Sequence, residues 1–463
     1  MQTALILAAG RSRRMMTRRA KVVHQVGGRP MIQHVVNAAR AAGLSRVLVV
    51  VGHRAEDVQA VLGDGVEYVL QEEQRGTGHA VLQAAAQLAG QEHVLVLNGD
   101  TPLLTADALA SLVEAHLARG QAATLMTTRV PDPTGYGRIQ RDGAGNIARI
   151  VEEADADEET RRINEINTGI GCYRVEPLMA ALGRVAPDNR QGEYYLVDVV
   201  PLMLAAGQQV GTCTVDDYRQ FLNVNDRRAL AAAEAAMRER VLDRLMAAGV
   251  TVVDPANTYV DDTVTVGMDT VILPFSIIKG DTVIGADCIV GPGAVIENSH
   301  LEDGCRVEQS TVRDSRLGAG SRVGPYSHLR PGTDLAPGVK VGNFAEIKNS
   351  TIGTGSKVSH HSYIGDSRIG RDVNIGAGAV TVNYDGYRKH ETIIGDEAFV
   401  GCNVNIIAPV EIAPDSYVAA GSTINQDVPS DALAIARARQ ENKPGWVSRR
   451  RQKMEKAEGA GSR

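Results

Sequence analysis

Residues 271–301 read VILPFSIIKGDTVIGADCIVGPGAVIENSHL, in which an aliphatic residue recurs at every sixth position. The same period continues over residues 260–424, interrupted by slips of one residue and by one insertion. It matches neither an α-helix nor a simple strand. It is typical of hexapeptide repeats, whose coils stack and bury one aliphatic residue on each side. The sequence therefore predicts an all-β left-handed parallel β-helix over residues 250–436.

The composition is that of a soluble globular protein with two or three domains, because 43% of the 463 residues are hydrophobic and 22% are charged. The formal net charge of -6 and the aromatic content of 4% argue against nucleic-acid binding. Five cysteines without a Cys-x-x-Cys pair favour a reduced, cytoplasmic protein. The first ten residues lack the features of a secretory signal, and no apolar run is long enough to span a membrane.

The first half opens with an apolar run at residues 3–7, which stops at Ala8-Ala9-Gly10 and enters a basic loop. A strand that leads into small residues presents backbone N–H groups to phosphates in many α/β folds, although a solvated basic loop is the alternative. Helix-like and strand-like stretches then alternate at 30–42, 47–51 and 94–97. This alternation predicts a Rossmann-like, mostly parallel sheet whose ligand lies at the carboxyl ends of the strands.

Asp100 directly follows a predicted buried strand, in the sequence Asn98-Gly99-Asp100. A hard divalent cation prefers oxygen ligands, so Asp100 is a candidate ligand for a metal above a triphosphate. The other interpretation is that Asp100 caps the next helix.

Several motifs of the first half resemble, in order, those of sugar-1-phosphate nucleotidylyltransferases. They are Leu7-Ala8-Ala9-Gly10 with Arg14-Met15, Lys21 and His24, then Gln71, Gly76-Thr77-Gly78-His79-Ala80, Asn98-Gly99-Asp100, Gly135-Tyr136-Gly137-Arg138, Val151-Glu152-Glu153, Ile166-Asn167-Thr168-Gly169 and Asn223-Val224-Asn225-Asp226-Arg227. With the hexapeptide region added, residues 1–446 resemble the family of bifunctional N-acetylglucosamine-1-phosphate uridyltransferases/glucosamine-1-phosphate acetyltransferases. The resemblance implies an enzyme that makes UDP-N-acetylglucosamine for envelope polysaccharides.

The resemblance implies that the first domain transfers the uridylyl group of UTP to N-acetylglucosamine-1-phosphate and releases pyrophosphate. Arg14 and Lys21 would neutralise the phosphates, and Asp100 and Asn225 would hold Mg²⁺, at one or two sites. The residues implied to bind UTP or the UDP-sugar are Leu7, Ala8, Ala9, Gly10, Lys21, Gln71, Gly76, Thr77, Asn98, Gly99, Asp100, Gly137, Glu152, Asn167 and Asn225.

Three positions of the phosphate loop depart from the family pattern. Ser12-Arg13 replaces the usual Gly-Thr, and Ala20 replaces the usual proline before the lysine. Loss of the glycine restricts close approach of the backbone to phosphates, and loss of the proline loosens the loop. An N-terminal domain without activity beside an active acetyltransferase therefore stays an open alternative.

The solenoid breaks its period between Ile375 and Ile394, where an insertion carries Asn383-Tyr384-Asp385-Gly386. Loops on a rigid scaffold commonly carry function. Polar residues also gather on the nearby coils, including the adjacent pair His360 and His361. Any one of them taken alone reads as a solvated surface residue, but the set predicts a second site.

The resemblance implies that this second site transfers an acetyl group from acetyl-CoA to glucosamine-1-phosphate, without a metal. His360 would be the general base, since an imidazole takes up protons near neutral pH, and Glu346 is a candidate to orient it. Because alternate residues on a strand face opposite sides, we expect His361 to point elsewhere. The implied ligands of glucosamine-1-phosphate are Arg330, Lys348, Tyr363 and Asn374. Those of acetyl-CoA are Ala377, Asn383, Tyr384, Cys402, Ala420 and Arg437.

The predicted domains are a nucleotidylyltransferase domain at 1–226, a linker helix at 227–249, the hexapeptide domain at 250–436 and a basic tail at 437–463. Asp226 is expected to cap the helix and Gly249 to end it. The resemblance to hexapeptide acyltransferases, which are typically trimers, implies a homotrimer with acetyl sites shared between subunits. The last fifteen or so residues are expected to be disordered.

Two other readings stay open. The solenoid of a nucleotidylyltransferase can serve only to oligomerise the enzyme, although the insertion and His360 argue against this. A regulatory subunit can bind nucleotide sugars without turnover, although the retained Arg14, Lys21, Asp100 and Asn225 argue against that.

Overall fold

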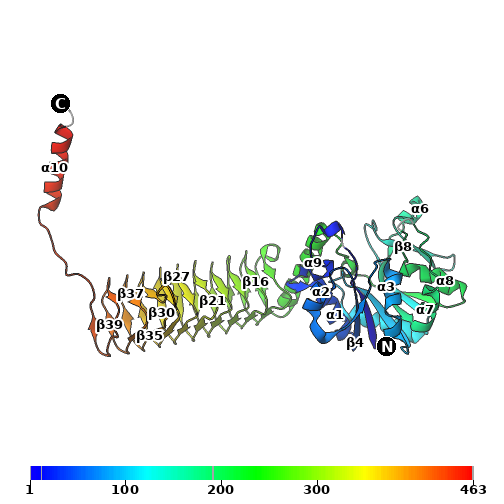
Figure 1. Ribbon diagram of the computed structural model, residues 1–463, viewed down its shortest axis with the longest axis horizontal. Coiled ribbons are helices and arrows are strands. Elements are labelled where there is room, and N and C mark those ends of the chain that lie inside the picture. Colours follow the sequence, from blue (N-terminus) through cyan, green and yellow to red (C-terminus); the bar gives the residue numbers. More distant parts are fainter. Residues whose placement is uncertain (1, 12, 190–191, 461–463) are drawn as a thin grey trace. The chain divides into compact units, whose positions relative to one another are not determined.

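The computed structural model describes residues 2–11, 13–189 and 192–460. The chain divides into two compact units, which are described separately (Figure 1). The first contains the described residues up to Ala248, with Tyr259–Val264 and Ile278–Gly280. The second contains Gly249–Thr258, Thr265–Ile277 and the described residues from Asp281 onwards.

The first unit is built on a mixed, mostly parallel sheet in the order β11-β7-β10-β6-β1-β4-β5, with the β8-β9 hairpin attached to β10. The central strands β6, β1, β4 and β5 are parallel, whereas β10 runs antiparallel to both of its neighbours in this order. The strands are β1 (Thr3–Leu7), β4 (Arg46–Val51), β5 (Glu67–Leu70), β6 (His93–Asn98), β7 (Ala123–Arg129), β8 (Gly137–Arg141), β9 (Ile147–Val151), β10 (Glu165–Arg174) and β11 (Val210–Thr214), with a separate pair, β2 (Gln25–Val26) and β3 (Arg29–Pro30).

Helices cover both faces of this sheet, as predicted for a Rossmann-like fold (Figure 1). Successive residues of a strand point to opposite faces of the sheet. In β1, Leu5 therefore packs in one hydrophobic cluster and Ile6 in the other. The α-helices are α1 (Met31–Ala41), α2 (Ala55–Leu62), α3 (Thr77–Gln83), α4 (Ala85–Leu88), α5 (Ala106–Arg119), α6 (Glu158–Arg161), α7 (Val175–Leu182), α8 (Val199–Ala205) and α9 (Arg227–Ala247). The short 3-10 helices of the chain are η1 (Arg13–Met15), η2 (Lys21–Val23), η3 (Gly63–Gly65), η4 (Leu196–Asp198), η5 (Tyr218–Phe221) and η6 (Pro255–Asn257).

Helix α9 occupies the position expected for the linker helix. The Asp226 side chain accepts a hydrogen bond of 2.9 Å from the Ala229 N–H and so caps the helix. The backbone turns into the left-handed region at Gly249, where φ is +89°, which a glycine adopts without strain. Ala233, Met237, Val241 and Leu245, which are spaced four residues apart along α9, are buried.

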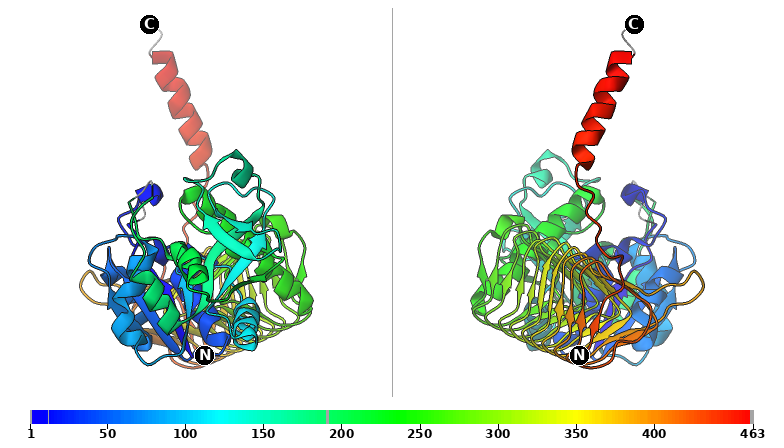
Figure 2. Two further views of the ribbon diagram at one scale, coloured as in Figure 1. Left: turned by 90° about the vertical axis from the view of Figure 1, so that its right-hand side faces the viewer. Right: turned by 90° about the vertical axis from the view of Figure 1, so that its left-hand side faces the viewer.

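The second unit is a left-handed parallel β-helix whose coils stack along its length (Figures 1 and 2). Its first sheet contains β12 (Thr251–Val252), β15 (Val271–Ile272), β18 (Ile289–Val290), β21 (Arg306–Val307), β24 (Arg322–Val323), β27 (Lys340–Asn343), β30 (Lys357–His360), β33 (Asn374–Ile375), β36 (Phe399–Val400), β39 (Tyr417–Val418) and β41 (Leu433–Ala434). The second contains β19 (Val295–Glu297), β22 (Thr311–Arg313), β25 (His328–Leu329), β28 (Glu346–Lys348), β31 (Tyr363–Gly365), β34 (Val380–Val382), β37 (Asn405–Ile407) and β40 (Thr423–Ile424).

The third sheet contains β14 (Thr265–Val266), β17 (Val283–Ile284), β20 (His300–Leu301), β23 (Arg316–Leu317), β26 (Asp334–Leu335), β29 (Thr351–Ile352), β32 (Ser367–Ile369), β35 (Thr392–Ile394) and β38 (Val410–Ile412). Strand β13 (Tyr259–Val260) and most of β16 (Ile277–Lys279) are grouped with the first unit. The residue that recurs every sixth position points into the solenoid, as Ile272, Ile284 and Ile296 illustrate, with at most 2% of each exposed. The period of six therefore reflects one buried side chain for each face of a coil.

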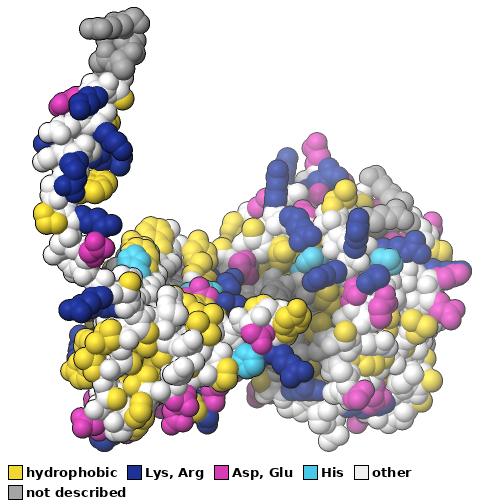
Figure 3. All heavy atoms as spheres, turned by 60° about the vertical axis from the view of Figure 1, so that its left-hand side comes forward, with side chains coloured by type: hydrophobic (Ala, Val, Ile, Leu, Met, Phe, Trp, Pro, Cys, Tyr) yellow, Lys and Arg dark blue, Asp and Glu magenta, His cyan; other side chains and the backbone are white. Residues whose placement is uncertain are grey.

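The end of the chain differs from the prediction of disorder. Residues Trp446–Ala460 form the helix α10, and basic side chains lie along it (Figure 3). Helix-forming residue types such as arginine, lysine, glutamine and alanine explain the helix without any tertiary contact. Arg450 stacks over the Trp446 ring at 5.2 Å. Among the helices described, none has the length and apolar character needed to cross a membrane.

Candidate active sites

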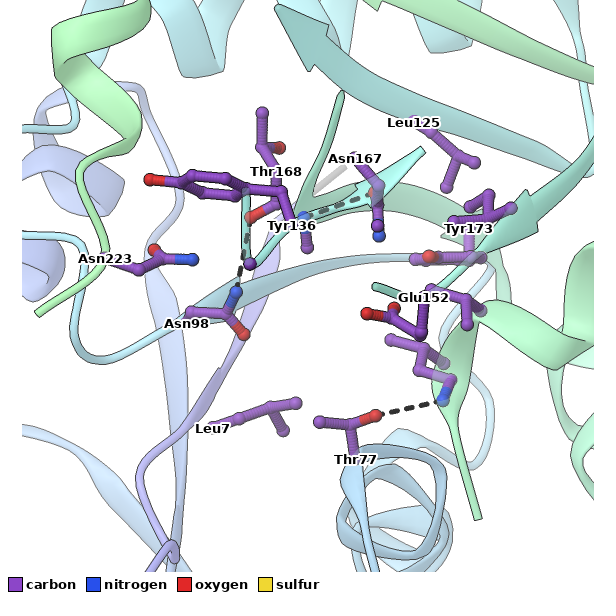
Figure 4. A pocket seen from close by; sticks show the side chains of 16 residues that line it. Leu7, Thr77, Asn98, Leu125, Tyr136, Glu152, Asn167, Thr168, Tyr173 and Asn223 are labelled. Carbon is purple, nitrogen blue, oxygen red and sulfur yellow. Dashed lines mark hydrogen bonds between the residues drawn. The ribbon is translucent and has the colours of Figure 1, made fainter. Parts of the chain in front are cut away.

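A cavity of about 180 Å³ opens at the carboxyl ends of the central strands of the first unit (Figure 4). Six of the residues that the resemblance assigns to nucleotide or sugar binding line it: Leu7, Thr77, Asn98, Gly137, Glu152 and Asn167. The strand ends are tied together, because the Gly99 N–H donates to the Leu7 carbonyl at 3.0 Å and the Gln71 N–H donates to the Val51 carbonyl at 2.8 Å. The doubly wound topology thus gathers motifs that lie far apart in the sequence.

Glu152 points into this cavity from the end of the β8-β9 hairpin (Figure 4). Burial raises the pKa of Glu152, and the nearby carboxylates of Asp198 and Asp155 raise it further. Asn167, on β10, also lines the cavity, and its Oδ1 accepts a hydrogen bond of 3.2 Å from the Gly169 N–H. Carboxylate and amide groups on one wall suit a ligand with several hydroxyl and amide groups.

The proposed metal ligands lie together. Lys21 Nζ contacts the Asp100 carboxylate and donates a hydrogen bond of 3.0 Å to Asn225 Oδ1. The Val224 N–H donates to the Asp100 carbonyl at 3.1 Å, which brings the segment before α9 to the end of β6. The next helix, α5, is capped by Thr105, so the interpretation of Asp100 as a helix cap is wrong.

Gln71, Gly76 and Thr77, three more of the residues implied to bind UTP or the UDP-sugar, form a second group around the end of β5. Gln71 is buried, and its Nε2 donates to the Gly76 carbonyl at 3.3 Å and contacts His79 Nδ1 at 2.9 Å. Gly76 has a φ of +110°, and a Cβ there would lie 2.5 Å from the Tyr194 carbonyl oxygen, so only glycine fits this turn. Thr77 Oγ1 accepts a hydrogen bond of 2.9 Å from the Leu196 N–H.

The phosphate loop contains both buried and exposed residues. Ala8 and Ala9 are buried, whereas Gly10 and Arg14 are exposed. Ser12 lies outside the described residues. Ala20, in place of the family's proline, is buried, and its N–H donates a hydrogen bond of 2.8 Å to Asp57 Oδ2. Proline has no N–H, so the residue that was expected to loosen the loop instead ties it to α2.

In the solenoid, the predicted sugar-phosphate ligands Arg330, Lys348 and Tyr363 lie on successive coils at the second sheet. Arg330 Nη1 donates to Glu346 Oε1 at 2.7 Å. Lys348 Nζ lies 3.8 Å from Asp366 Oδ2, and Asn383 Nδ2 donates to the same oxygen. The insertion therefore returns Asn383 to this cluster of cationic and polar groups.

The side chains of the adjacent residues His360 and His361 point in different directions, but not because of the expected alternation along a strand. His360 ends β30, and its Nδ1 is hydrogen bonded to Asn343 Oδ1 on the neighbouring coil. His361 lies beyond the strand at a corner with φ of +48°, and its ring stacks on Phe344 at 5.0 Å. The left-handed corner turns the second ring away. Glu346, the candidate to orient His360, is paired with Arg330 instead.

Three of the predicted acetyl-CoA residues, Ala377, Cys402 and Ala420, follow one corner along the stack. The Asn403 N–H donates to the Ala377 carbonyl at 2.7 Å, and the Gly421 N–H donates to the Cys402 carbonyl at 2.8 Å. Ala377, Cys402 and Ala420 are thus in neighbouring coils, and Cys402 is exposed. Arg437 is exposed, and its Cδ lies 3.7 Å from the Cβ position of Gly421. Asn374 lies on the first sheet, in register with Lys357 and Phe399.

Comparisons with known proteins agree on both halves of the chain. The MobA-like NTP transferase domain model matches residues 4–166, and the bacterial transferase hexapeptide model (six repeats) matches residues 263–298 and 391–426. The bifunctional protein GlmU of Exiguobacterium sp. strain AT1b is 52% identical over 447 residues, which cover 96% of this chain and 99% of that protein. The chain belongs to the bifunctional GlmU family.

Two further GlmU proteins are similar over the same extent. That of Geobacillus sp. strain WCH70 is 48% identical over 96% of this chain and 97% of its own length, and that of Caldanaerobacter subterraneus is 50% identical over 96% and 98%. The chain is thus a bifunctional uridyltransferase and acetyltransferase, with the nucleotidyltransferase domain first and the hexapeptide acetyltransferase repeats second. The predicted family, fold and pair of activities are confirmed. A purely oligomerising solenoid and a subunit without turnover are set aside.

The cavity of this GlmU family member also has walls that the sequence analysis did not assign. Tyr136, Thr168 and Asn223 line it, and all three stand in the motifs quoted above, so position within a motif was an available signal. Leu196 and Val197 line it as well. They come from η4, a segment without a sequence motif, and only the folding of α3 against η4 brings them there.

Proposed function

We propose that the hexapeptide domain acetylates glucosamine-1-phosphate with acetyl-CoA, and that the N-terminal domain then transfers the uridylyl group of UTP to the N-acetylglucosamine-1-phosphate so formed. Uridylyl transfer by the N-terminal domain is supported by the cavity, which has Glu152 and Asn167 on one wall, and by Lys21 near the strand ends. The bonded pair of His360 and Asn343, and the cluster of Lys348, Asp366 and Asn383, support the second.

In uridylyl transfer, a phosphate oxygen of the sugar phosphate attacks the α-phosphorus of UTP, and the bond to the β-phosphate oxygen breaks to release pyrophosphate. Arg14 and Lys21 neutralise the charge on the leaving group. Leu7, Ala8, Ala9, Gly10, Gln71, Gly76 and Thr77 hold the uridine, and Asn98, Gly99, Gly137, Glu152 and Asn167 surround the sugar end.

Asp100 and Asn225 are proposed to hold Mg²⁺, which supplies charge neutralisation at the phosphates. Their oxygens fit a cation, since both already converge on the ammonium of Lys21. Among the described residues, no group of three His, Cys, Asp or Glu side chains forms a metal site. Two protein oxygens suit Mg²⁺, because it keeps waters and phosphate oxygens as its other ligands.

In acetyl transfer, His360 takes a proton from the amino group of glucosamine-1-phosphate. The amine nitrogen forms a bond to the thioester carbonyl carbon, the carbon–sulfur bond breaks, and the leaving sulfur takes up the proton held by His360 to give the coenzyme A thiol. Arg330 and Lys348 bind the sugar phosphate, with Tyr363 and Asn374 at the sugar. Ala377, Asn383, Tyr384, Cys402, Ala420 and Arg437 bind acetyl-CoA.

The expected assembly is a cytoplasmic homotrimer formed through the β-helix, with acetyl sites between subunits. Supporting observations are the exposed corner residues of the proposed coenzyme A row and the five free cysteines. The proposed domains are 1–226, the linker helix 227–249, the hexapeptide domain 250–436 and the tail 437–463.

A split assay tests the proposal. One reaction contains glucosamine-1-phosphate and acetyl-CoA and is scored for free thiol, and the other contains N-acetylglucosamine-1-phosphate, UTP and Mg²⁺ and is scored for pyrophosphate. We expect His360→Ala to lower thiol release by about 10²- to 10⁴-fold and leave pyrophosphate release unchanged, and Asp100→Ala to do the reverse. Thiol release by His360→Ala at the wild-type rate would refute the role of His360.

A further inference from the structure

Asn343 lies at the end of β27 and His360 at the end of β30, and the two residues are partners in the parallel register of these strands. The imidazole Nδ1 of His360 is hydrogen bonded to the amide oxygen of Asn343. His360 is exposed, and Asn343 is half-buried. The residue that contacts the proposed base is therefore an amide on the next coil.

The backbone around this pair is fixed on both sides. The His361 N–H donates to the Asn343 carbonyl and the Gly378 N–H donates to the His360 carbonyl, each at 3.1 Å. Directly after the pair, Phe344 and His361 form left-handed corners, with φ of +58° and +48°. Their rings stack on one another, and Tyr326 stacks on Phe344 at 5.5 Å. The backbone contacts leave the His360 ring free to rotate about its side-chain bonds, and the hydrogen bond to Asn343 fixes that rotation.

An amide oxygen only accepts hydrogen bonds, so Nδ1 of His360 carries the hydrogen. In the neutral imidazole, the lone pair then lies on Nε2, which is the nitrogen left to accept a proton from the substrate amine. Glu346, the carboxylate that the sequence offered as a partner for His360, is held by Arg330 at 2.7 Å. An uncharged partner orients the ring without favouring the imidazolium as a carboxylate would.

We propose that Asn343 is a positioning residue for acetyl transfer, which fixes the tautomer and the ring orientation of His360. The inference rests on the proposed role of His360 as general base. Asn343 touches the base and not the reacting atoms, so its removal affects the chemical step more than substrate binding.

The test measures thiol release by full-length Asn343→Ala, Asn343→Asp and His360→Ala across pH. We expect Asn343→Ala to lower kcat about 10- to 100-fold, as for other residues that orient a functional histidine, with KM for both substrates changed less than about twofold. Asn343→Asp keeps the acceptor, so it restores most of kcat at high pH. Its carboxylate favours the imidazolium, so the acid limb of its kcat profile moves to higher pH.

Asn298→Ala is the matched control, since Asn298 also bonds between coils, to Asp314 at 3.3 Å. It is expected to leave thiol release unchanged. Wild-type kcat in Asn343→Ala, a loss confined to KM, or an unshifted acid limb in Asn343→Asp each overturns the positioning role. If His360→Ala itself releases thiol at the wild-type rate, the proposed base is wrong and the failure lies with the proposed function.

Discussion

At the scale of the residue, the burial of Glu152 determines how the cavity of the first unit responds to pH. Glu152 is held in the sugar-side cavity with Asp198 and Asp155 nearby. Its pKa lies above the ordinary range of a glutamate, first because of burial and then because of the two carboxylates. A protonated Glu152 loses part of its capacity to accept hydrogen bonds from sugar hydroxyl groups.

We therefore expect KM for N-acetylglucosamine-1-phosphate to rise as pH falls, starting above the range in which an ordinary glutamate titrates. Glu152→Gln cannot titrate, so its KM is higher at neutral pH but independent of pH. Asp198→Asn removes a negative charge near Glu152 and lowers the pKa of Glu152, so the rise in KM starts at a lower pH than in the wild type. The measurement is pyrophosphate release as a function of substrate concentration between pH 5 and 8, with Glu158→Gln as an exposed control. A wild-type KM that is flat with pH would contradict the role of Glu152.

At the scale of the element, α5 is attached to the sheet through a buried histidine. His116 Nε2 contacts His93 Nδ1 on β6 at 3.0 Å, and His116 Nδ1 contacts Thr124 Oγ1 on β7 at 3.0 Å. His116 has no exposed surface. Burial, together with the nearby His93 and Arg174 charges, lowers its pKa from 6.5 to about 4.

This depressed pKa predicts loss of stability in acid. Below pH 6.5 the unfolded chain binds a proton that folded His116 does not, so the free energy of unfolding falls until about pH 4. The shift corresponds to about 3 kcal/mol. Urea unfolding of the first unit at pH 7 and pH 4 measures it, and His116→Gln is expected to be less stable at pH 7 but less sensitive to acid. Equal pH dependence of the two proteins would contradict this explanation.

The first sheet of the solenoid carries four cationic side chains in register on consecutive coils. They are Arg306, Arg322, Lys340 and Lys357. All four are exposed, and Arg306 is paired with Glu308 at 3.5 Å. Like charges directly opposite one another on neighbouring strands are destabilising, and salt screens them.

Replacement of an inner member of this row should stabilise the solenoid. We expect Arg322→Thr to raise the melting temperature by a few degrees at low ionic strength, with a smaller gain at high salt, because the repulsion is then screened. Thermal unfolding at two salt concentrations measures the difference. Arg368→Thr is the control, since Arg368 is paired with Glu391 at 2.7 Å, and it should not stabilise. A gain independent of salt would point to strand propensity and not to charge.

At the scale of the whole molecule, the assembly decides whether the acetyl site is complete in one chain. If His360 and Arg437 of one site come from different subunits of the proposed trimer, mixed trimers of His360→Ala and Arg437→Ala contain some intact sites. Random mixing then restores thiol release to about one quarter of the wild-type rate. Sites built within one chain restore none. Co-expressed, differently tagged variants provide this measurement.

Much of both units was readable from local patterns. The period of six predicted the coils because each face of a coil buries one aliphatic side chain, and the strand-turn motifs predicted the edge of the sheet where Leu7, Asn98 and Asp100 lie. The resemblance supplied the family and the residue roles, which periodicity alone does not give. Helix α10 was missed, because its charged composition is shared by exposed helices and disordered chains.

The sequence by itself determined the fold of each unit, because hydrophobic periods and glycine-rich turns are local and repeat along the chain. Contacts between distant segments were decided only by the tertiary structure. The bond from Asn343 to His360 depends on the exact register of two coils, and the approach of Leu196 to Thr77 depends on how η4 packs on α3. The hydrogen bond from the Ala20 N–H to Asp57 likewise depends on how distant segments pack. A side chain's partner is chosen by packing in three dimensions, and no local pattern encodes it.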